Sequence, residues 1–367
     1  MLAAVVDRID VLRELERWGA ERDWLGADPY EGMNAPLARL VGRTPKLRQA
    51  VIQAYRRAPV DPPPPLRPKP RRNAKTVALV LSGYVAAPLA DRERQIAAGL
   101  YHLAQLRTGG GWGYHFDFQS RWGSYGAEVP NAIATCFAAG ALVDAGRPEL
   151  ALAARRYLGH DLWNPDGRYF GYVGAGAVLI HNANALVCGT LARLHEIDPD
   201  DELAERVRAA ARTTTDLQRP DGSWPYGESP SLGWIDNFHT AYTLEGLHEV
   251  DRVLGEAGAA VERGYDFWSR ALIEDDGTAR ARADRRYPLE THSYATAIDT
   301  LVMLRERRAD GVALAERVAQ AAIRDLWLPE RGHFAFERYP RWTNRRAFVR
   351  WTNAPMFRAL ARLAGAA

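Results

Sequence analysis

The chain has 367 residues, of which 47% are hydrophobic and 25% charged, so it can bury a large core in one repeat-built domain or in two ordinary ones. Its net charge of +3 is too small for bulk electrostatic attraction to nucleic acid. Two cysteines in apolar stretches argue against a disulfide scaffold, and no apolar run is long enough to span a membrane. We therefore expect a soluble protein of the reducing cytoplasm.

The first 76 residues are predicted to form two helices and a Pro-rich arm. Residues 4–18 and 36–56 have the apolar periodicity of amphipathic helices and together make roughly one helical hairpin. Charges in the first helix distinguish it from a signal peptide. Residues 56–75, RRAPVDPPPPLRPKPRRNAK, are expected to be extended and to run over the outside of the fold as a strap. Their basic side chains leave open a contact with an acidic partner or a membrane surface.

Residues 77–367 are repetitive. Turns that join glycine to aromatic or acidic residues recur at GGGWGY, NPDGRYFGY, QRPDGSWPYG, EDDGTARAR and PERGHFAF. One glycine from each turn follows the previous one by 56 or 55 residues: Gly111, Gly167, Gly222, Gly277 and Gly332. An apolar-periodic helix precedes each turn, and a loop and a second helix follow it. Glycine suits these positions because it ends a helix in the left-handed conformation at least cost, beside an aromatic residue that covers the helix end.

Repeated helical hairpins must bury their inner faces against their neighbours. Five hairpins are visible in the repeats, and the N-terminal helices add roughly one more, which is enough to close a ring. We therefore predict an all-α fold, an α/α toroid of about six helical hairpins, in preference to an open solenoid. The segment 1–76 and the repeats 77–367 are expected to form a single structural domain.

Two of the turns share the spacing Q-x-x-x-G-x-W: Gln218, Gly222 and Trp224, and more loosely Gln105, Gly109 and Trp112. This pattern resembles the QW motif of squalene-hopene cyclases and related toroids. Similar turns occur in α/α-toroid polysaccharide lyases and six-hairpin glycosidases. The resemblance supports the fold more than any one function.

In a closed toroid, the N-terminal ends of the inner helices and the loops before them should face one central cleft. HNAN (181–184), DNFH (236–239) and THSY (291–294) occupy the same position in successive repeats. We expect the cleft to be lined by Trp112, Tyr114, Asp117, Arg121, Tyr125, His181, Asn182, Asp236, Asn237, His239, His292, Tyr294, Arg350 and Trp351. Asn and Asp before a helix are also common caps. Aromatic faces among polar groups suit a sugar polymer, because the faces stack on pyranose rings.

These residue types suit proton abstraction α to a uronate carboxylate, which needs a group that neutralises the carboxylate, a base and an acid. They are the set that α/α-toroid polysaccharide lyases and uronyl C5-epimerases use. The predicted catalytic residues are His239 as base or acid, Tyr294 as the opposite proton carrier, Tyr242 and Asn237. Arg346 and Arg350 are the predicted carboxylate clamps, because a guanidinium binds a carboxylate bidentately.

Three other functions stay open. A pair among Asp117, Asp236 and Glu290 could act as acid and base in glycoside hydrolysis. A class II terpenoid cyclase would need an Asp-rich protonating motif, and the sequence offers only Asp198–Asp201, interrupted by Pro between two helices of a pair. A glycan-binding toroid without catalytic activity is the third.

Further motifs point to carbohydrate. DPYEGMNAPLARL (28–40), IQAYRRAPVD (52–61), WGYHFDFQ (112–119) and DNFHT (236–240) resemble a family associated with bacterial surface-polysaccharide gene clusters. RWTNAPMFRAL (350–360) resembles the C-terminal Arg-Trp helix of glucuronyl C5-epimerases. These resemblances imply a polysaccharide or lipid-linked glycan substrate and a role in polysaccharide assembly. We expect no cofactor and no nucleic acid partner. We also expect no metal, because no paired-His spacing such as H-E-x-x-H occurs.

Overall fold

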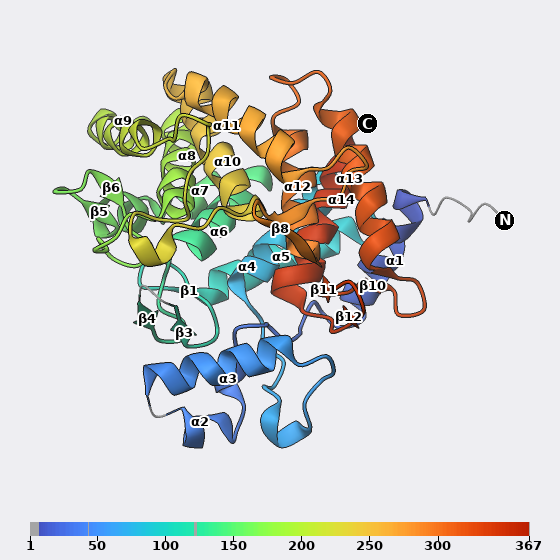
Figure 1. Cartoon of the computed structure of the whole chain (residues 1–367). Coiled ribbons are helices and arrows are strands. Elements are labelled where there is room, and N and C mark those ends of the chain that lie inside the picture. Colours follow the sequence, from blue (N-terminus) through green and yellow to red (C-terminus); the bar gives the residue numbers. More distant parts are fainter. Residues whose placement is uncertain (1–6, 43, 121–122, 367) are drawn as a thin grey trace.

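A ring of six inner helices forms the centre of the computed structural model, which describes residues 7–42, 44–120 and 123–366 (Figure 1). The inner helices are α4 (Ala74–Ala86), α6 (Ala132–Asp144), α8 (His181–Ile197), α10 (Asn237–Leu254), α12 (Thr291–Met303) and α14 (Ala354–Ala366). Each packs against the next in this order, and α14 packs against α4. The ring is therefore closed, and the predicted α/α toroid is confirmed.

A second layer of helices surrounds this ring. It consists of α1 (Arg8–Ala20), α5 (Arg92–Leu106), α7 (Pro148–Leu152) with the π-helical turn η3 (Tyr157–Asp161), α9 (Asp201–Asp216), α11 (Gly258–Leu272) and α13 (Gly311–Leu326). Outer helices such as α9 bury one apolar face and leave the other in solvent. Inner helices such as α6 are apolar and buried over most of their surface, because they have neighbours on several sides.

The sixth hairpin differs from the prediction. The first helix, α1, packs against α13 and α14, and the sixth inner helix of the ring is α4 and not a helix of the segment 36–56. That segment forms α2 (Ala38–Val41) and α3 (Pro45–Arg57). The inner position needs a helix that is apolar on most sides. The helix α4 meets this need and is buried along most of its length, whereas α3 is largely polar and buries only Ile52 and Tyr55.

Residues 32–70 form a separate N-terminal lobe at one end of the ring (Figure 1). The lobe contains η1 (Gly32–Asn34), α2, α3 and η2 (Pro64–Leu66). The Pro-rich arm belongs to this lobe, where Arg346 donates to Asp61 at 2.9 Å. A division of the chain at 76/77 stays a prediction, and α4 itself begins at Ala74.

The repeated turns close the C-terminal ends of outer helices, but the left-handed glycine expected in each turn occurs in only three of the five. Gly111 and Gly167 do not have positive φ, and Gly109, Gly110 and Arg168 adopt it in those two turns instead. Gly222, Gly277 and Gly332 have φ of 92°, 84° and 65°, in the left-handed region. The indole nitrogens of Trp224 and Trp112 donate to the carbonyls of Thr214 and Leu103 at 2.9 and 2.7 Å. These bonds satisfy carbonyl groups that a helix end leaves without partners.

Strands, which the sequence analysis did not predict, are confined to the loops. An antiparallel sheet has the order β12 (Thr343–Asn344), β11 (Glu337–Arg338), β8 (Arg285–Glu290) and β7 (Arg280–Arg282). Two-residue hairpins pair β1 (Arg107–Thr108) with β2 (Gly111–Trp112), β3 (Phe118–Gln119) with β4 (Ser124–Tyr125), β5 (Trp163–Asn164) with β6 (Tyr169–Phe170), and β9 (Trp327–Leu328) with β10 (His333–Phe334). The four-stranded sheet joins the loops before α12 and α14 and sets Glu337 opposite Glu290.

Buried and half-buried ion pairs bridge the inner helices on the side away from the N-terminal ends. Arg358 and Arg362 of α14 bind Asp299 of α12, and Arg193 of α8 binds Asp144 of α6 at 2.8 Å. These pairs tie the inner helices together around a small pocket of about 80 Å³. Among the described residues, no helix is both long and apolar enough to cross a membrane.

Candidate functional site

A cavity of about 710 Å³ opens at the N-terminal ends of the inner helices. The second residue of every inner segment lines it: Lys75 of α4, Ile133 of α6, Asn182 of α8, Phe238 of α10, His292 of α12, and Arg350 of the π-helical turn η5 (Val349–Asn353) that leads into α14. The six helices thus place equivalent positions around one space. This is the convergence that the repeat predicted.

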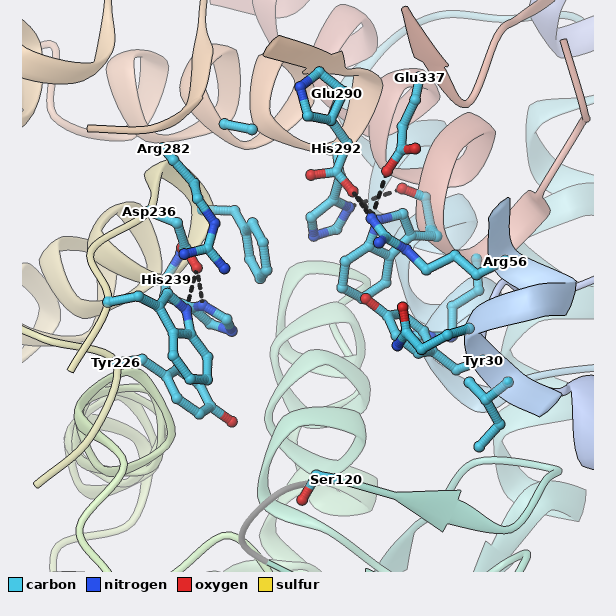
Figure 2. Close-up of a pocket in the computed structure, with 18 of the residues that line it drawn as sticks. Tyr30, Arg56, Ser120, Tyr226, Asp236, His239, Arg282, Glu290, His292 and Glu337 are labelled. Carbon is cyan, nitrogen blue, oxygen red and sulfur yellow. Dashed lines mark hydrogen bonds and ion pairs between the residues drawn. The ribbon is translucent and has the colours of Figure 1, made fainter. Parts of the chain in front are cut away.

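Asp236 and His239 form a dyad on one wall of the cavity (Figure 2). Asp236 caps α10, and its Oδ1 accepts the backbone N–H of His239 at 3.0 Å. Its Oδ2 accepts from His239 Nδ1 at 2.7 Å and from Trp234 Nε1 at 2.9 Å. Because Nδ1 donates to a carboxylate, the lone pair of neutral His239 resides on Nε2. The His239 side chain is 21% exposed, so this nitrogen is available for proton transfer.

Arg282 lies beside the dyad on the same wall (Figure 2). A backbone bridge joins Arg282 to Asp236, and the guanidinium lies 5.6 Å from the Trp234 ring centre. In the part of the chain that the structure describes, no carboxylate lies within ion-pair distance of Arg282. Trp234 and Tyr226 stack at 4.7 Å with an interplanar angle of 14°. This wall therefore combines a base, a guanidinium and a flat aromatic surface.

Glu290, at the end of β8, lies across the cavity from the dyad (Figure 2). Burial, assisted by the negative charge of Glu337, raises the pKa of Glu290 to about 7 despite the nearby Arg56 guanidinium. Arg56 is ion-paired with Glu337 and lies 3.8 Å from Glu290. Trp351 Nε1 donates to Glu290 at 2.6 Å. A carboxyl group with such a pKa is partly protonated at neutral pH and can donate a proton.

A buried chain of hydrogen bonds also borders the cavity. Lys75 Nζ donates to the Tyr242 hydroxyl at 3.4 Å, and Tyr242 is 3.2 Å from His292 Nε2. His292 Nδ1 donates to the Trp351 carbonyl at 2.9 Å, so the Tyr242 hydroxyl must donate to Nε2. Burial, together with the positive charge of Arg350, holds the pKa of His292 well below its usual value. His292 is therefore a neutral acceptor at neutral pH.

Nine of the sequence-predicted residues line the cavity: Tyr114, Asn182, Asp236, His239, Tyr242, Glu290, His292, Arg350 and Trp351. Arg350 has a different environment from the one expected of a clamp. Both its Nε and a terminal nitrogen donate to the buried carboxylate of Asp28. Its charge is thus already neutralised by the protein.

Tyr294 does not reach the cavity, contrary to expectation. Its hydroxyl donates to Asp325 of α13 at 2.8 Å, and its side chain is fully buried. The cause is a shift of helix register: α12 begins at Thr291 and α10 at Asn237, so their starts are 54 residues apart and not 55. One residue turns a side chain by about 100° around the helix. The position that corresponds to His239 is therefore Ser293.

Asn237 and Arg346 also face away from the cavity and make structural contacts. Asn237 accepts from Trp268 Nε1 at 3.1 Å and donates to the Leu272 carbonyl, which ties α10 to α11. Arg346 donates to Asp61 and to the Tyr55 carbonyl, which ties the N-terminal lobe to the ring.

The other predicted residues lie outside the cavity lining. The Trp112 indole is buried at the end of α5. Asp117 accepts from the Ala127 N–H, and His181 pairs with Glu228 at 2.8 Å. Tyr125 stacks on Phe118, itself a lining residue. Arg121 lies outside the described residues.

Sequence reasoning missed Tyr30, Arg56, Lys75, Arg282 and Glu337, all of which line the cavity. A rule based on the second residue of each inner helix would have found Lys75, which follows the helix cap Asn73. Arg56 opens the segment 56–75, which we had expected to run over the outside of the fold as a strap, and Tyr30 lies between the two predicted N-terminal helices. Among the described residues, no group of three or more His, Cys, Asp or Glu side chains is placed to hold a metal ion.

Comparison with known proteins identifies the fold. No family model and no curated protein matches the sequence. The structure is similar to cellobiose 2-epimerase from Bacillus thermoamylovorans B4167, with a TM-score of 0.65, 11% identity, and 97% and 98% of the two chains covered. Unsaturated glucuronyl hydrolase from Bacillus sp. GL1 is similar with a TM-score of 0.63 and 14% identity, and the match covers 97% of this chain and 95% of that one. ent-Copalyl diphosphate synthase from Streptomyces platensis is similar with a TM-score of 0.58 and 19% identity, and the match covers 98% of this chain and 67% of that one. At these identities the likeness establishes the α/α toroid.

Proposed function

We propose that the protein is a carbohydrate-active enzyme that acts on a uronate-containing glycan or glycan precursor and removes the proton α to the carboxylate. One observation carries this proposal: His239, oriented by Asp236, presents a free Nε2 beside the unpaired guanidinium of Arg282. A base adjacent to a carboxylate-binding cation is what C5 proton abstraction from a uronate needs.

The mechanism follows from these positions. Arg282 binds the uronate carboxylate and stabilises the negative charge that grows on it as C5–H breaks. His239 Nε2 takes the proton, and Asp236 stabilises the imidazolium that forms. The Tyr226–Trp234 stack supports the sugar ring. In this assignment Arg282 takes the role that the sequence suggested for Arg346 and Arg350.

Glu290 supplies the second proton carrier. It lies on the other side of the cavity from His239 and is partly protonated at neutral pH. Protonation of the opposite face of C5 inverts that carbon, so this geometry favours epimerisation. Elimination would instead need a proton delivered to the leaving oxygen on the face of His239.

Glycoside hydrolysis is the second candidate, and the raised pKa of Glu290 favours it as a general acid. A hydrolase also needs a free carboxylate to activate water or act as nucleophile. Both oxygens of Asp236 are already bonded to His239 and Trp234, and Glu337 is paired with Arg56. Asp117 does not line the cavity. The groups that line the cavity therefore fit proton abstraction better than glycoside hydrolysis.

The similar folds are compatible with this proposal, since an epimerase of cellobiose and a glucuronyl hydrolase are among them. They also include an ent-copalyl diphosphate synthase. The Asp-rich stretch that a cyclase would need lies at the α8–α9 turn, where Asp200 caps α9, and does not line the cavity. A cyclase or a glycan-binding toroid would become the better assignment only if the test below gave no product from any uronate polymer.

The proposal includes a lipid-linked substrate and a peripheral contact of the N-terminal lobe with an anionic membrane. Residues 44–70 contain six basic residues and one acidic residue, Asp61, which is bound to Arg346. Leu37, Leu40 and Leu66 of the lobe are 46%, 65% and 47% exposed. Exposed aliphatic groups among basic side chains suit an anionic lipid surface. Free, buried Cys136 and Cys188 accord with the cytoplasmic location that we propose.

The test uses a panel of polymers of glucuronate, mannuronate and galacturonate. Nuclear magnetic resonance of the products distinguishes an inverted C5 from a 4,5-unsaturated end or a new reducing end. Inverted or unsaturated products in one polymer support the proposal. If the only change were new saturated reducing ends, the protein would be a glycoside hydrolase instead.

A further inference from the structure

Lys75 is the one lysine of the chain that lies in the cavity. The sequence holds only three lysines among 48 basic residues, and the other two, Lys46 and Lys69, are exposed on the N-terminal lobe. Lys75 is 2% exposed and lines the cavity as the second residue of α4. Arginine is always protonated, whereas a buried lysine can lose its proton. A chain that otherwise relies on arginine thus has its single buried lysine at the site.

The surroundings of Lys75 disfavour its charged form. Within the described residues, no carboxylate lies within ion-pair distance of Nζ. The amine lies 4.2 Å from the ring centre of Phe137 and 5.1 Å from that of Tyr242, and these faces oppose the loss of its charge only weakly compared with an ion pair. Burial, reinforced by the positive charges of Arg350 and Arg358, holds the Lys75 pKa well below its usual value, and the more distant Glu245 and Asp28 oppose this only in part. Such an amine has an available lone pair.

Hydrogen bonding leaves that lone pair unused. Tyr242 donates its only hydroxyl proton to His292 Nε2, so the contact with Lys75 must use an N–H of the lysine. The Nζ lone pair is therefore not engaged by Tyr242. The cavity that Lys75 lines is large enough for a sugar unit.

We propose that Lys75 is a nucleophile that forms an imine with the carbonyl carbon of an open-chain sugar in this cavity. The Nζ lone pair attacks the aldehyde or ketone carbon, and a carbinolamine forms. Loss of water then gives the C=N bond, and both amine hydrogens leave with the carbonyl oxygen. No oxidant or reductant is needed. This site is additional to the His239 chemistry and does not depend on it.

Reductive trapping tests this inference on the full-length protein. The probe is glyceraldehyde with sodium cyanoborohydride at pH 7, and peptide mass mapping separates the three lysines from the N-terminal amine. We expect Lys75 to be labelled at least about tenfold faster than Lys46 and Lys69, because each unit of pKa depression raises the neutral fraction tenfold. Unfolding in urea should abolish the difference.

Three variants make the result decisive. The double variant Lys46→Arg/Lys69→Arg retains Lys75 as its only lysine and should still form the adduct, whereas Lys75→Arg should form none on that peptide while keeping the helical circular dichroism of the wild type. His239→Gln should label normally, which separates this site from the proposed uronate reaction. Labelling of Lys75 no faster than that of Lys46 and Lys69 in the folded protein would overturn the inference.

Discussion

The proposed reaction depends on the tautomer of one residue, His239. Asp236→Asn keeps an oxygen that can cap α10 but removes the carboxylate that fixes His239 Nδ1–H. We expect kcat to fall about 10²–10⁴-fold in His239→Gln, the usual contribution of a general base, and substantially in Asp236→Asn. Steady-state rates on the responsive uronate polymer measure both effects. Unfolding midpoints equal to that of the wild type would exclude a collapsed site, and full activity in His239→Gln would remove this residue from the mechanism.

The second residue-scale prediction concerns pH. If Glu290 must be protonated to act, activity declines as the pH rises through about 7, the pKa to which burial raises this group. Glu337→Gln removes a negative charge that raises this pKa and leaves Arg56 beside Glu290 alone. The alkaline limb of kcat/KM should therefore move to lower pH by about one unit.

The matched control is Glu330→Gln, because Glu330 is exposed and does not line the cavity. Its pH profile should overlay that of the wild type. An alkaline limb that stays in place in Glu337→Gln would contradict the role assigned to Glu290.

At the scale of elements, the glycine turns offer a direct test of why the repeat needs glycine. Gly222 has φ of 92°, and a Cβ there would clash with the Arg263 carbonyl. Gly255 has φ of 70° but open space around it. Gly255→Ala is expected to cost about 1–2 kcal/mol of unfolding free energy, from the backbone conformation alone. Gly222→Ala should cost more than twice that in urea denaturation, and equal losses would refute the packing argument.

The N-terminal lobe gives the second element-scale prediction. The full-length protein should co-sediment with vesicles that contain phosphatidylglycerol more than with neutral phosphatidylcholine vesicles, and high salt should weaken the binding. Leu40→Asp and Lys46→Glu should each reduce binding several-fold. Arg94→Glu, exposed on the outer helix α5, should leave it unchanged. Equal binding of all variants, or none by the wild type, would contradict membrane docking by the lobe.

The helices and loops also show how much of the fold and of the candidate site could be predicted from the sequence. The 55-residue repeat sufficed for the ring, because each unit carries its own helix periodicity and turn glycine. It also located the cavity at the helix starts, where His239 and His292 lie. Tyr294 was assigned wrongly because helix starts drift by a residue between repeats. Arg282 belongs to a loop strand whose pairing with Asp236 is long-range and leaves no periodic signal.

At the scale of the whole molecule, the closed ring makes six helix starts equivalent in position while their side chains differ. Lys75 of α4 and Arg350 of η5, the turn that leads into α14, come from the two segments that close the ring, whereas Asn182 comes from α8. One architecture therefore brings a base, a guanidinium and a partly protonated carboxyl to a single cavity. The similarity to sugar epimerases, a glucuronyl hydrolase and a diphosphate synthase shows how widely this fold is used.

The central claim, abstraction of a uronate proton by His239, is tested most directly by isotope exchange. The protein is incubated in deuterated water with each uronate polymer, and C5 is followed by nuclear magnetic resonance. The account predicts deuterium at C5 with the wild type and at least about 100-fold slower incorporation with His239→Gln. Sugar turnover without deuterium at C5, or unchanged exchange in His239→Gln, would contradict it.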